Sequence, residues 1–442
     1  MIEALLDRAR RHADGGADAL WRRTERTTVA FEWGRLKGAA VTEEAGVNLR
    51  VRDHGRVGVA GTTAIDGTAD ELLARALASA ALGDTVALEF PPARPLPSLA
   101  TFAAPAADAP LDRLIALGRA VLERLERDGC RINVTVERET TETRVGNSAG
   151  AAATYRATAI AVSAELWRIA GDDVLVVGDS SEGTDLPTDE ALEALVRSIN
   201  ERVEPALRVV APPDGALPVV FTPAGLSAML LPLTQGLSGK AVLQGISPLA
   251  GKIGEPVFDA RLALTDDPLH PGRPASRPVD DECVPSRTTG LVEGGTVRGF
   301  IYDLETAARA NTGSTGHGQR SIFGRPTPGY TNLLVGPARP ATGNGSARLG
   351  GGLVEELRDG LLVDELIGVG QGNVIGGAFS HPVALAYRIE RGAITGRVKD
   401  AAVAGNAYEL WKRVGGFGRD ARWTSGRYAP SVLFNGVSVA RR

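Results

Sequence analysis

The chain has 442 residues and a formal net charge of −4, with 49 Lys+Arg residues against 53 Asp+Glu residues. This balance argues against a nucleic-acid-binding surface, because such surfaces carry clustered basic residues. Hydrophobic residues make up 43% of the chain, which is enough to build sizeable cores and excludes a mainly disordered protein.

The segment from residue 1 to residue 82 predicts a helix, a group of strands and a second helix. Its start is amphipathic and contains acidic side chains, unlike a signal peptide, which has an apolar core. Residues 18–63 are predicted to form strands, first as an Arg/Thr-rich extended stretch through Phe31 and then with clear apolar–polar alternation from Val47 to Arg52. The helix at about 68–82 begins with a capping box formed by Thr68 and Glu71.

The same order of elements recurs roughly 120 residues later. A helix with an apolar stripe is predicted at about 109–127, strands follow between about 132 and 177, and another helix begins after Thr188. This degenerate strand–strand–helix repeat predicts an α+β fold for an N-terminal α/β domain, residues 1–210. Any antiparallel sheet with two helices would show the same order, so an arrangement without a repeat stays open.

The composition changes after Ala211-Pro-Pro-Asp-Gly215, which is the best linker candidate. One helix-like segment at about 223–237 is followed by short apolar stretches punctuated by Gly and Pro. We therefore predict a β-rich C-terminal domain over residues 216–442. No apolar run reaches about 18 residues, so we expect no membrane-spanning segment and a cytoplasmic protein.

The residues taken alone do not form a recognisable active site. None of the histidines has the helical spacing that a zinc site needs. The histidines are His12, His54, His270, His317 and His381. His317 and His381 could still meet in space around a metal, although turn histidines are more often exposed or hydrogen-bonded.

Nucleophilic catalysis has no clear candidate either. The one GxSxG match, Gly146-Asn-Ser-Ala-Gly150, falls in a predicted turn between two strands, whereas a nucleophile elbow leads from a strand into a helix. Cys130 and Cys283 are too far apart for a CxxC pair, and they provide no disulfide framework. The acidic neighbours of Cys283 disfavour a reactive thiolate.

Several segments of the C-terminal half resemble the TldD/PmbA family, and in particular its PmbA (TldE) branch. Their order and spacing agree with the family from about residue 216 to the end, and the N-terminal half agrees more loosely. The matching segments are Gln235-Gly-Leu-Ser-Gly-Lys240, Pro278-Val-Asp-Asp-Glu282, Asn311-Thr-Gly-Ser-Thr-Gly-His-Gly318, Leu362-Val-Asp-Glu-Leu-Ile-Gly-Val-Gly370, Gly376-Gly-Ala-Phe-Ser380, Tyr387-Arg-Ile-Glu-Arg-Gly-Ala-Ile394 and Val403-Ala-Gly-Asn406.

The resemblance implies a TldD–TldE-type heterodimeric metallopeptidase. In such pairs the TldD-type subunit carries HExxxH on a helix, and a later cysteine completes its zinc site. In this chain the two histidine positions fall on Leu231 and Gln235, the glutamate position on Pro232 and the cysteine position near Ser425. Leucine cannot ligate zinc and proline cannot act as a general base. We therefore expect no catalytic residue, metal ligand or cofactor in this chain, and zinc in a TldD-like partner.

The first hypothesis is a non-catalytic TldE/PmbA-like subunit of a peptidase that cleaves unstructured or modified peptides or peptide-like biosynthetic intermediates. Loops 311–318 and 376–381 would supply its substrate contacts, although both loops also fit tight turns that need glycine. The candidate contacts are Ser314, Thr315, His317, Ser380 and His381.

Two other hypotheses remain open. One is a non-enzymatic scaffold or binding protein, which could form a homodimer. The other is an enzyme with unrelated catalytic residues, such as Asp280, Asp281 and Glu282, which we expect to be exposed in a turn.

Overall fold

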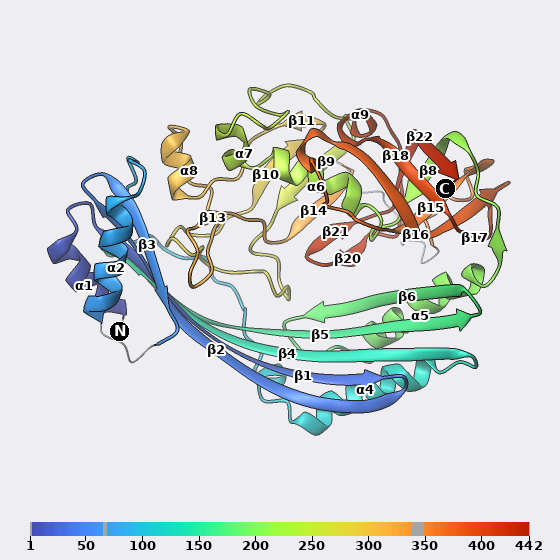
Figure 1. Cartoon of the computed structure of the whole chain (residues 1–442), viewed down its shortest axis with the longest axis horizontal. Helices are drawn as coiled ribbons and strands as arrows, with labels where there is room; N and C mark the ends of the chain where they lie inside the picture. Colours follow the sequence, from blue (N-terminus) through green and yellow to red (C-terminus); the bar gives the residue numbers. More distant parts are fainter. Residues whose placement is uncertain (1, 65–68, 338–348, 442) are drawn as a thin grey trace.

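In the computed structural model of the protein, residues 2–64, 69–337 and 349–441 are described. A six-stranded antiparallel sheet forms the base of the N-terminal half, with the strand order β3-β2-β1-β4-β5-β6. Figure 1 shows these long strands curving beneath the C-terminal half. The strands are β1 (Ala17–Glu32), β2 (Arg35–Asp53), β3 (Arg56–Thr62), β4 (Cys130–Asn147), β5 (Ala152–Ala170) and β6 (Asp173–Gly183).

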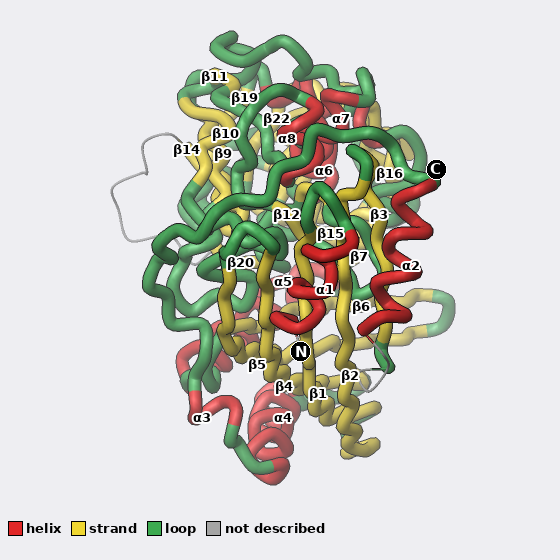
Figure 2. The backbone as a smooth tube through the Cα atoms, turned by 90° about the vertical axis from the view of Figure 1, so that its left-hand side faces the viewer, coloured by secondary structure: helices red, strands yellow, loops and turns green. Residues whose placement is uncertain are grey.

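Helices cover one face of this sheet, because alternate side chains of its strands are apolar on that side. At one end α1 (Ile2–His12) and α2 (Ala69–Ala81) pack on the sheet, and at the other α4 (Leu111–Leu125) and α5 (Asp189–Ala206) do so. The short α3 (Ala104–Ala107) contacts β4 and β5. Figure 2 shows α1 and α2 at the end nearer to the viewer. The apolar stripes predicted from sequence therefore face the core.

The predicted repeat is visible in the order of the elements. The series β1, β2, β3 and α2 is followed by β4, β5, β6 and α5, and the sheet order is symmetric about the β1–β4 pair. This arrangement confirms the α+β fold. Thr188 caps α5, because its side chain accepts a hydrogen bond from the Ala191 amide at 3.2 Å. Thr68, which we expected to cap α2, lies outside the described residues.

The C-terminal half is β-rich, as predicted. In one sheet β15 pairs with both β8 and β16, so the path β15-β8-β22-β18-β16 closes into a barrel. A second sheet has the order β11-β10-β9-β14-β21-β20. The strands are β7 (Val209–Val210), β8 (Gly215–Phe221), β9 (Leu262–Asp266), β10 (Thr289–Glu293), β11 (Thr296–Val297), β12 (Gly318–Gln319), β13 (Thr327–Pro328), β14 (Leu333–Pro337), β15 (Asp359–Leu366), β16 (Ala378–Glu390), β17 (Ala393–Val398), β18 (Ala401–Asn406), β19 (Val414–Phe417), β20 (Arg422–Thr424), β21 (Arg427–Ala429) and β22 (Val432–Arg441).

Short helices connect these sheets. They are α6 (Ser227–Gly236), α7 (Gly239–Leu243), α8 (Leu304–Arg309), the 3₁₀ turn η1 (Val374–Gly376) and α9 (Ala407–Trp411). None of the helices in the described ranges is long and apolar enough to cross a membrane.

One hydrophobic cluster contains side chains from both halves of the chain. Leu195 and Ile199 of α5 share it with Leu362 of β15 and Tyr387 of β16. Strand β7, just before the predicted linker, also pairs with β17 of the barrel sheet. The division into domains 1–210 and 216–442 stays a prediction.

Candidate functional site

Helix α6 carries the positions at which the family resemblance places a degenerate zinc motif. Leu231 and Gln235 lie one turn apart on the same face, where Leu231 is half-buried and Gln235 is exposed. Leu231 faces a glycine loop, since a Cβ atom added at Gly370 would lie 3.5 Å from its Cδ2. The sequence of α6 contains no His, Cys, Asp or Glu. Its exposed face therefore offers neither zinc ligands nor a carboxylate that could activate water.

Pro232 is buried inside α6, and aromatic side chains bind the helix carbonyls around it. The Tyr408 hydroxyl donates to the Pro232 carbonyl at 2.8 Å, and the Trp411 indole donates to the Met229 carbonyl at 3.0 Å. The Tyr330 hydroxyl likewise donates to the carbonyl of Thr234 at 2.7 Å. The helix is therefore held by packing and hydrogen bonds, and these residues do not fit a catalytic zinc ion.

The predicted contact His317 is buried in a hydrogen-bond network. Its Nε2 lies 3.1 Å from a carboxylate oxygen of Asp266, and its Nδ1 lies 2.9 Å from the Thr315 hydroxyl. Asp266 in turn accepts hydrogen bonds from the amide and hydroxyl of Thr331. Both ring nitrogens thus have partners within the chain, and Ser314 and Thr315 themselves bond the carbonyl of Tyr302.

Ser380 and His381 lie on the barrel strand β16. Ser380 is exposed, and the half-buried His381 ring stacks on Phe379 with 6.1 Å between ring centroids. Burial lowers the pKa of His381, so its imidazole is neutral at pH 7. In the described residues no hydrogen bond, ion pair or ring contact joins His381 to His317. The role of all five residues in substrate contact stays a prediction.

The acidic segment Asp280–Glu282 is buried, so our expectation that it is exposed was wrong. The exposed fractions of the three residues are 1%, 3% and 0%. They are enclosed because arginines of the N-terminal sheet pair with them: Arg50 binds Glu282 at 2.6 Å, and Arg22 binds Asp281 at 2.7 Å. Burial raises the pKa of Glu282 to about 8 and that of Asp280 to about 6. These carboxylates join the two halves of the chain and have no access to a substrate.

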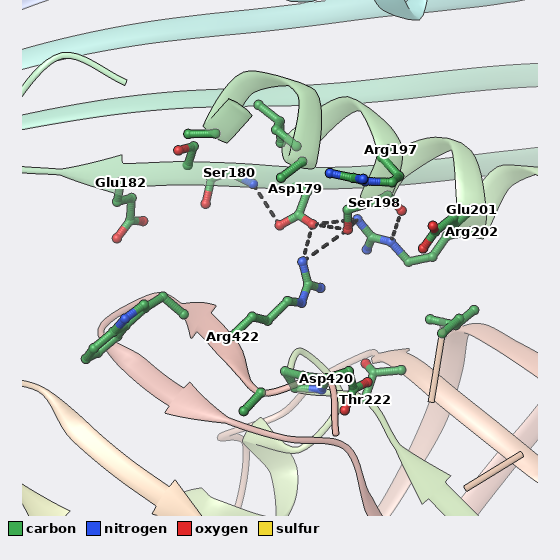
Figure 3. A pocket seen from close by; sticks show the side chains of 18 of the residues that line it. Asp179, Ser180, Glu182, Arg197, Ser198, Glu201, Arg202, Thr222, Asp420 and Arg422 are labelled. Carbon is green, nitrogen blue, oxygen red and sulfur yellow. Dashed lines mark hydrogen bonds and ion pairs between the residues drawn. The ribbon is translucent and has the colours of Figure 1, made fainter. Parts of the chain in front are cut away.

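A cleft of about 570 Å³ lies between the β6–α5 edge and the β20–β21 turn. Figure 3 shows Arg422 reaching across it from β20 to Asp179 on β6 and Ser198 on α5. Arg202 also pairs with Asp179, at 3.0 Å. Although burial alone would raise it, these two guanidinium groups hold the pKa of Asp179 below its usual value.

The rest of the cleft is polar and carries charges of both signs. Arg273 stacks over the Trp423 ring at 4.2 Å and donates to the carbonyl of Glu182 at 2.9 Å. Arg197 and Arg419 lie exposed at the rim. The described residues that line the cleft include no His, Cys or Lys, so none of them is a histidine that could activate Ser198. The cleft therefore presents hydrogen-bonding groups and charges of both signs.

Ser425 lines this cleft, whereas Leu231, Pro232 and Gln235 do not. No local sequence pattern indicates this cleft, because its arginines and acids come from segments around residues 180, 200, 273 and 420. Each of them alone resembles an ordinary surface charge.

The described residues contain one group of three side chains whose potential ligand atoms lie within 4.8 Å of one another, namely Asp14, Asp53 and His54. Asp14 instead caps the β2–β3 turn by accepting the His54 amide hydrogen bond at 2.8 Å. Asp53 accepts from the Asp14 amide at 3.4 Å. These turn contacts account for the group without a metal.

Two parts of the chain match known family models, and the whole chain has a fold similar to a solved structure. Residues 214–441 match the PmbA/TldA metallopeptidase C-terminal domain, and residues 17–80 match the PmbA/TldA metallopeptidase domain 1. The crystal structure of TldE from Thermococcus kodakarensis has a similar fold, with a TM-score of 0.87 and 24% identity over 99% of both chains.

Two curated relatives are similar in sequence over part of their length. A metalloprotease from Methanothermobacter thermautotrophicus is 30% identical over 53% of this chain and 49% of its own length. A metalloprotease TldD homologue from Haemophilus influenzae is 31% identical over 47% of this chain and 42% of its own length. The matched part of the chain thus spans about half the length of these relatives.

Proposed function

The chain belongs to the PmbA/TldD metallopeptidase family, and on this premise we propose that it is the non-catalytic, TldE-like subunit of a heterodimeric metallopeptidase. The observation that carries the proposal is α6. A zinc peptidase needs protein ligands to the metal and a base for the attacking water. The corresponding positions hold Leu231, Pro232 and Gln235, and the helix is fixed around a buried proline. The partner would be a family member with HExxxH on the equivalent helix.

In this arrangement the chain supplies binding surface and the partner supplies the zinc chemistry. The arginine-lined cleft suits an extended, unstructured peptide, because guanidinium groups and carboxylates can bind peptide main-chain and charged groups. Arg422 is the central residue, since it crosses the cleft between its two walls. The loops with Ser314 and Ser380 would add contacts at other points of the substrate.

The proposal is tested by purifying the chain alone and together with an HExxxH-bearing relative from the same genome. Zinc content is measured by mass spectrometry, and cleavage is measured with unstructured peptides. We expect stoichiometric zinc and activity only in the complex. Stoichiometric zinc or cleavage in the chain alone would show that the assignment of α6 is wrong.

A variant of the complex tests the role of the cleft separately. Arg422→Ala should raise KM for an acidic peptide about five- to tenfold and leave kcat unchanged, as expected for a lost charged binding contact. Arg298→Ala is the matched control, because Arg298 is exposed and pairs with Glu293 outside the cleft. An unchanged KM in Arg422→Ala would remove the cleft from the substrate path.

A further inference from the structure

A second, smaller pocket lies between the N-terminal sheet and residues 274–277 of the C-terminal half. Its volume is about 240 Å³. Strands β1, β4 and β5 form its floor, where Arg22, Thr143 and Tyr155 occupy paired positions on the three neighbouring strands. Threonine and alanine side chains cover most of this floor, so the pocket keeps room for a small ligand.

The guanidinium group of Arg277 lines this pocket without a matching acceptor. The residue is only 8% exposed, and among the described residues its Nε and Nη2 have no hydrogen-bond partner. Its Nη1 lies 3.8 Å from a carboxylate oxygen of Asp281, which is too far for a hydrogen bond. Burying an unpaired cation destabilises a fold, and an anion in the pocket would reduce this penalty.

Asp281 does not neutralise Arg277 fully, because other donors already bind it. Its Oδ1 accepts from Arg22 at 2.7 Å, and its Oδ2 accepts from the Arg320 amide at 2.9 Å. Arg22 is also oriented by Thr143, whose hydroxyl oxygen accepts from its Nε at 3.4 Å. The guanidinium groups of Arg22 and Arg277 therefore share one carboxylate, which leaves one positive charge at the pocket.

Glu139 is the acidic side chain among the described residues that line the pocket, and it is neutralised by another arginine. The Nη2 and Nε atoms of Arg26 donate to Glu139 Oε2 at 2.6 and 3.1 Å. The balance of charge thus favours a ligand with one negative charge. A dianion such as sulfate would bring a second negative charge close to Glu139 and Asp281.

Hydroxyl groups complete the lining of the pocket. Burial raises the pKa of Tyr155, so its hydroxyl stays protonated at pH 7 and can donate a hydrogen bond. The hydroxyls of Thr24 and Thr141 lie 3.1 Å apart on the floor. A carboxylate accepts hydrogen bonds at both of its oxygens, and guanidinium and hydroxyl donors match this demand.

We propose that this pocket binds a carboxylate group, with Arg277 as its main charged contact and Arg22 and Tyr155 as further donors. Nη1 is the nitrogen of Arg277 that the ligand would reach, because Nε and Nη2 are enclosed. A peptide C-terminus and a small free acid offer the same carboxylate chemistry. The inference does not depend on the proposed peptidase function, because binding to the chain alone is a separate readout from zinc content and cleavage.

Isothermal titration calorimetry on the full chain tests the class of ligand. The probes are acetate, N-acetyl-alanyl-alanine with a free carboxylate, the C-terminal amide of the same peptide, and sulfate, all at equal ionic strength. We expect the peptide acid to bind with a Kd of about 1 mM or tighter, and the amide and sulfate about tenfold more weakly or less. Acetate that binds more weakly than the peptide acid identifies a peptide terminus as the ligand, and equal affinity identifies a small free acid. Absent binding of both acids, or equal binding of the amide or sulfate, would overturn the proposal.

Substitution of Arg277 tests which side chain binds the probe. Arg277→Gln should weaken binding of the peptide acid about tenfold or more, because it removes the charge that faces the pocket. Arg388→Gln is the matched control, since the Arg388 side chain is also little exposed, at 16%, but pairs with Asp359 in the barrel. The control should bind like the wild type. Unchanged affinity in Arg277→Gln would overturn the proposal.

Stability separates a binding role of Arg277 from a structural one. Arg277→Met keeps the apolar stem and removes the unpaired donors, while Asp281 keeps its bonds to Arg22 and to the Arg320 amide. Without ligand, the urea midpoint should therefore stay unchanged or rise. Saturating peptide acid should raise the midpoint of the wild type but not that of the variant. A lower midpoint in the variant without ligand would show that Arg277 is a structural cation and would overturn the proposal.

Discussion

Arg50 provides a quantitative test of how the two halves of the chain are joined. Its side chain is fully buried and binds Asp18 of β1 and Glu282 of the acidic segment. Arg50→Met keeps the size and apolar stem of the side chain but removes its charge. Asp18 retains a partner in Arg320 at 2.8 Å, so Glu282 is the carboxylate that loses its cation.

The expected cost follows from this single orphaned group. Removing one partner of a buried ion pair typically costs about 3–5 kcal/mol. Because its pKa is raised to about 8, Glu282 is already largely protonated at pH 7, so only part of it is left as an unpaired charge and we expect the lower end, about 3 kcal/mol of unfolding free energy. Adding Glu282→Gln should recover about 1 kcal/mol or more, since neighbours that share an interaction are not additive.

The assay is urea unfolding followed by circular dichroism at pH 7. Arg26→Met is the matched control, because Arg26 pairs with Glu139 at a similar distance, 2.6 Å, but is half exposed. Exposed pairs contribute about 0–1 kcal/mol. If Arg50→Met and Arg26→Met cost the same, the buried network does not hold the halves together and the reasoning fails.

Three further predictions concern pH, packing and metal binding. Because the pKa of Glu282 is raised to about 8 in the folded chain, the stability that this group contributes is present below about pH 4.5 and is lost as the pH rises to about 8. Glu282→Gln should therefore flatten the fall of the urea midpoint between pH 5 and 8. An unchanged slope of midpoint against pH would contradict this prediction. Gly58→Ala should lower the free energy of unfolding in urea by more than about 3 kcal/mol, because its Cβ would lie 2.2 Å from the backbone of α2. The control Gly290→Ala, whose Cβ would have no atom within 4 Å, should lower it by less than about 1 kcal/mol. Equal losses would show that α2 can shift away from the new Cβ at little cost. The double variant Leu231→His with Gln235→His should bind Co²⁺, because it places two imidazoles one turn apart on the outer face of α6. The bound ion should be visible in the absorption spectrum of the variant and absent from that of the wild type. A variant without this spectrum would mean that a metal ion cannot reach this face of α6.

Local sequence patterns predicted most of the secondary structure. Extended and alternating stretches predicted strands within 18–63 and between about 132 and 177, where β1 to β6 lie, and 3.6-residue stripes predicted α2, α4 and α5. The repeat could be found because both copies keep the same order of elements. The family motifs, together with the residues on α6, predicted the family and the likeness to TldE-type proteins.

The acidic segment shows why burial could not be predicted in the same way. Asp280, Asp281 and Glu282 resemble an exposed turn, and Asp280 does accept turn hydrogen bonds from the amides of Glu282 and Val284. Their burial depends on Arg22 and Arg50, which lie more than 200 positions earlier. No local pattern records which cation will neutralise a carboxylate.

The sequence by itself determined the elements, the fold class and the absence of HExxxH from α6, because periodicity, capping and motif chemistry are properties of neighbouring residues. Only the tertiary structure decided that the sheet is symmetric about β1 and β4, that Arg422 closes a cleft against Asp179, and that Arg22 and Arg277 line one pocket. These features arise from contacts between distant segments. They are set by which surfaces can pack together and which charges must be neutralised on burial, and a local stretch of sequence contains neither.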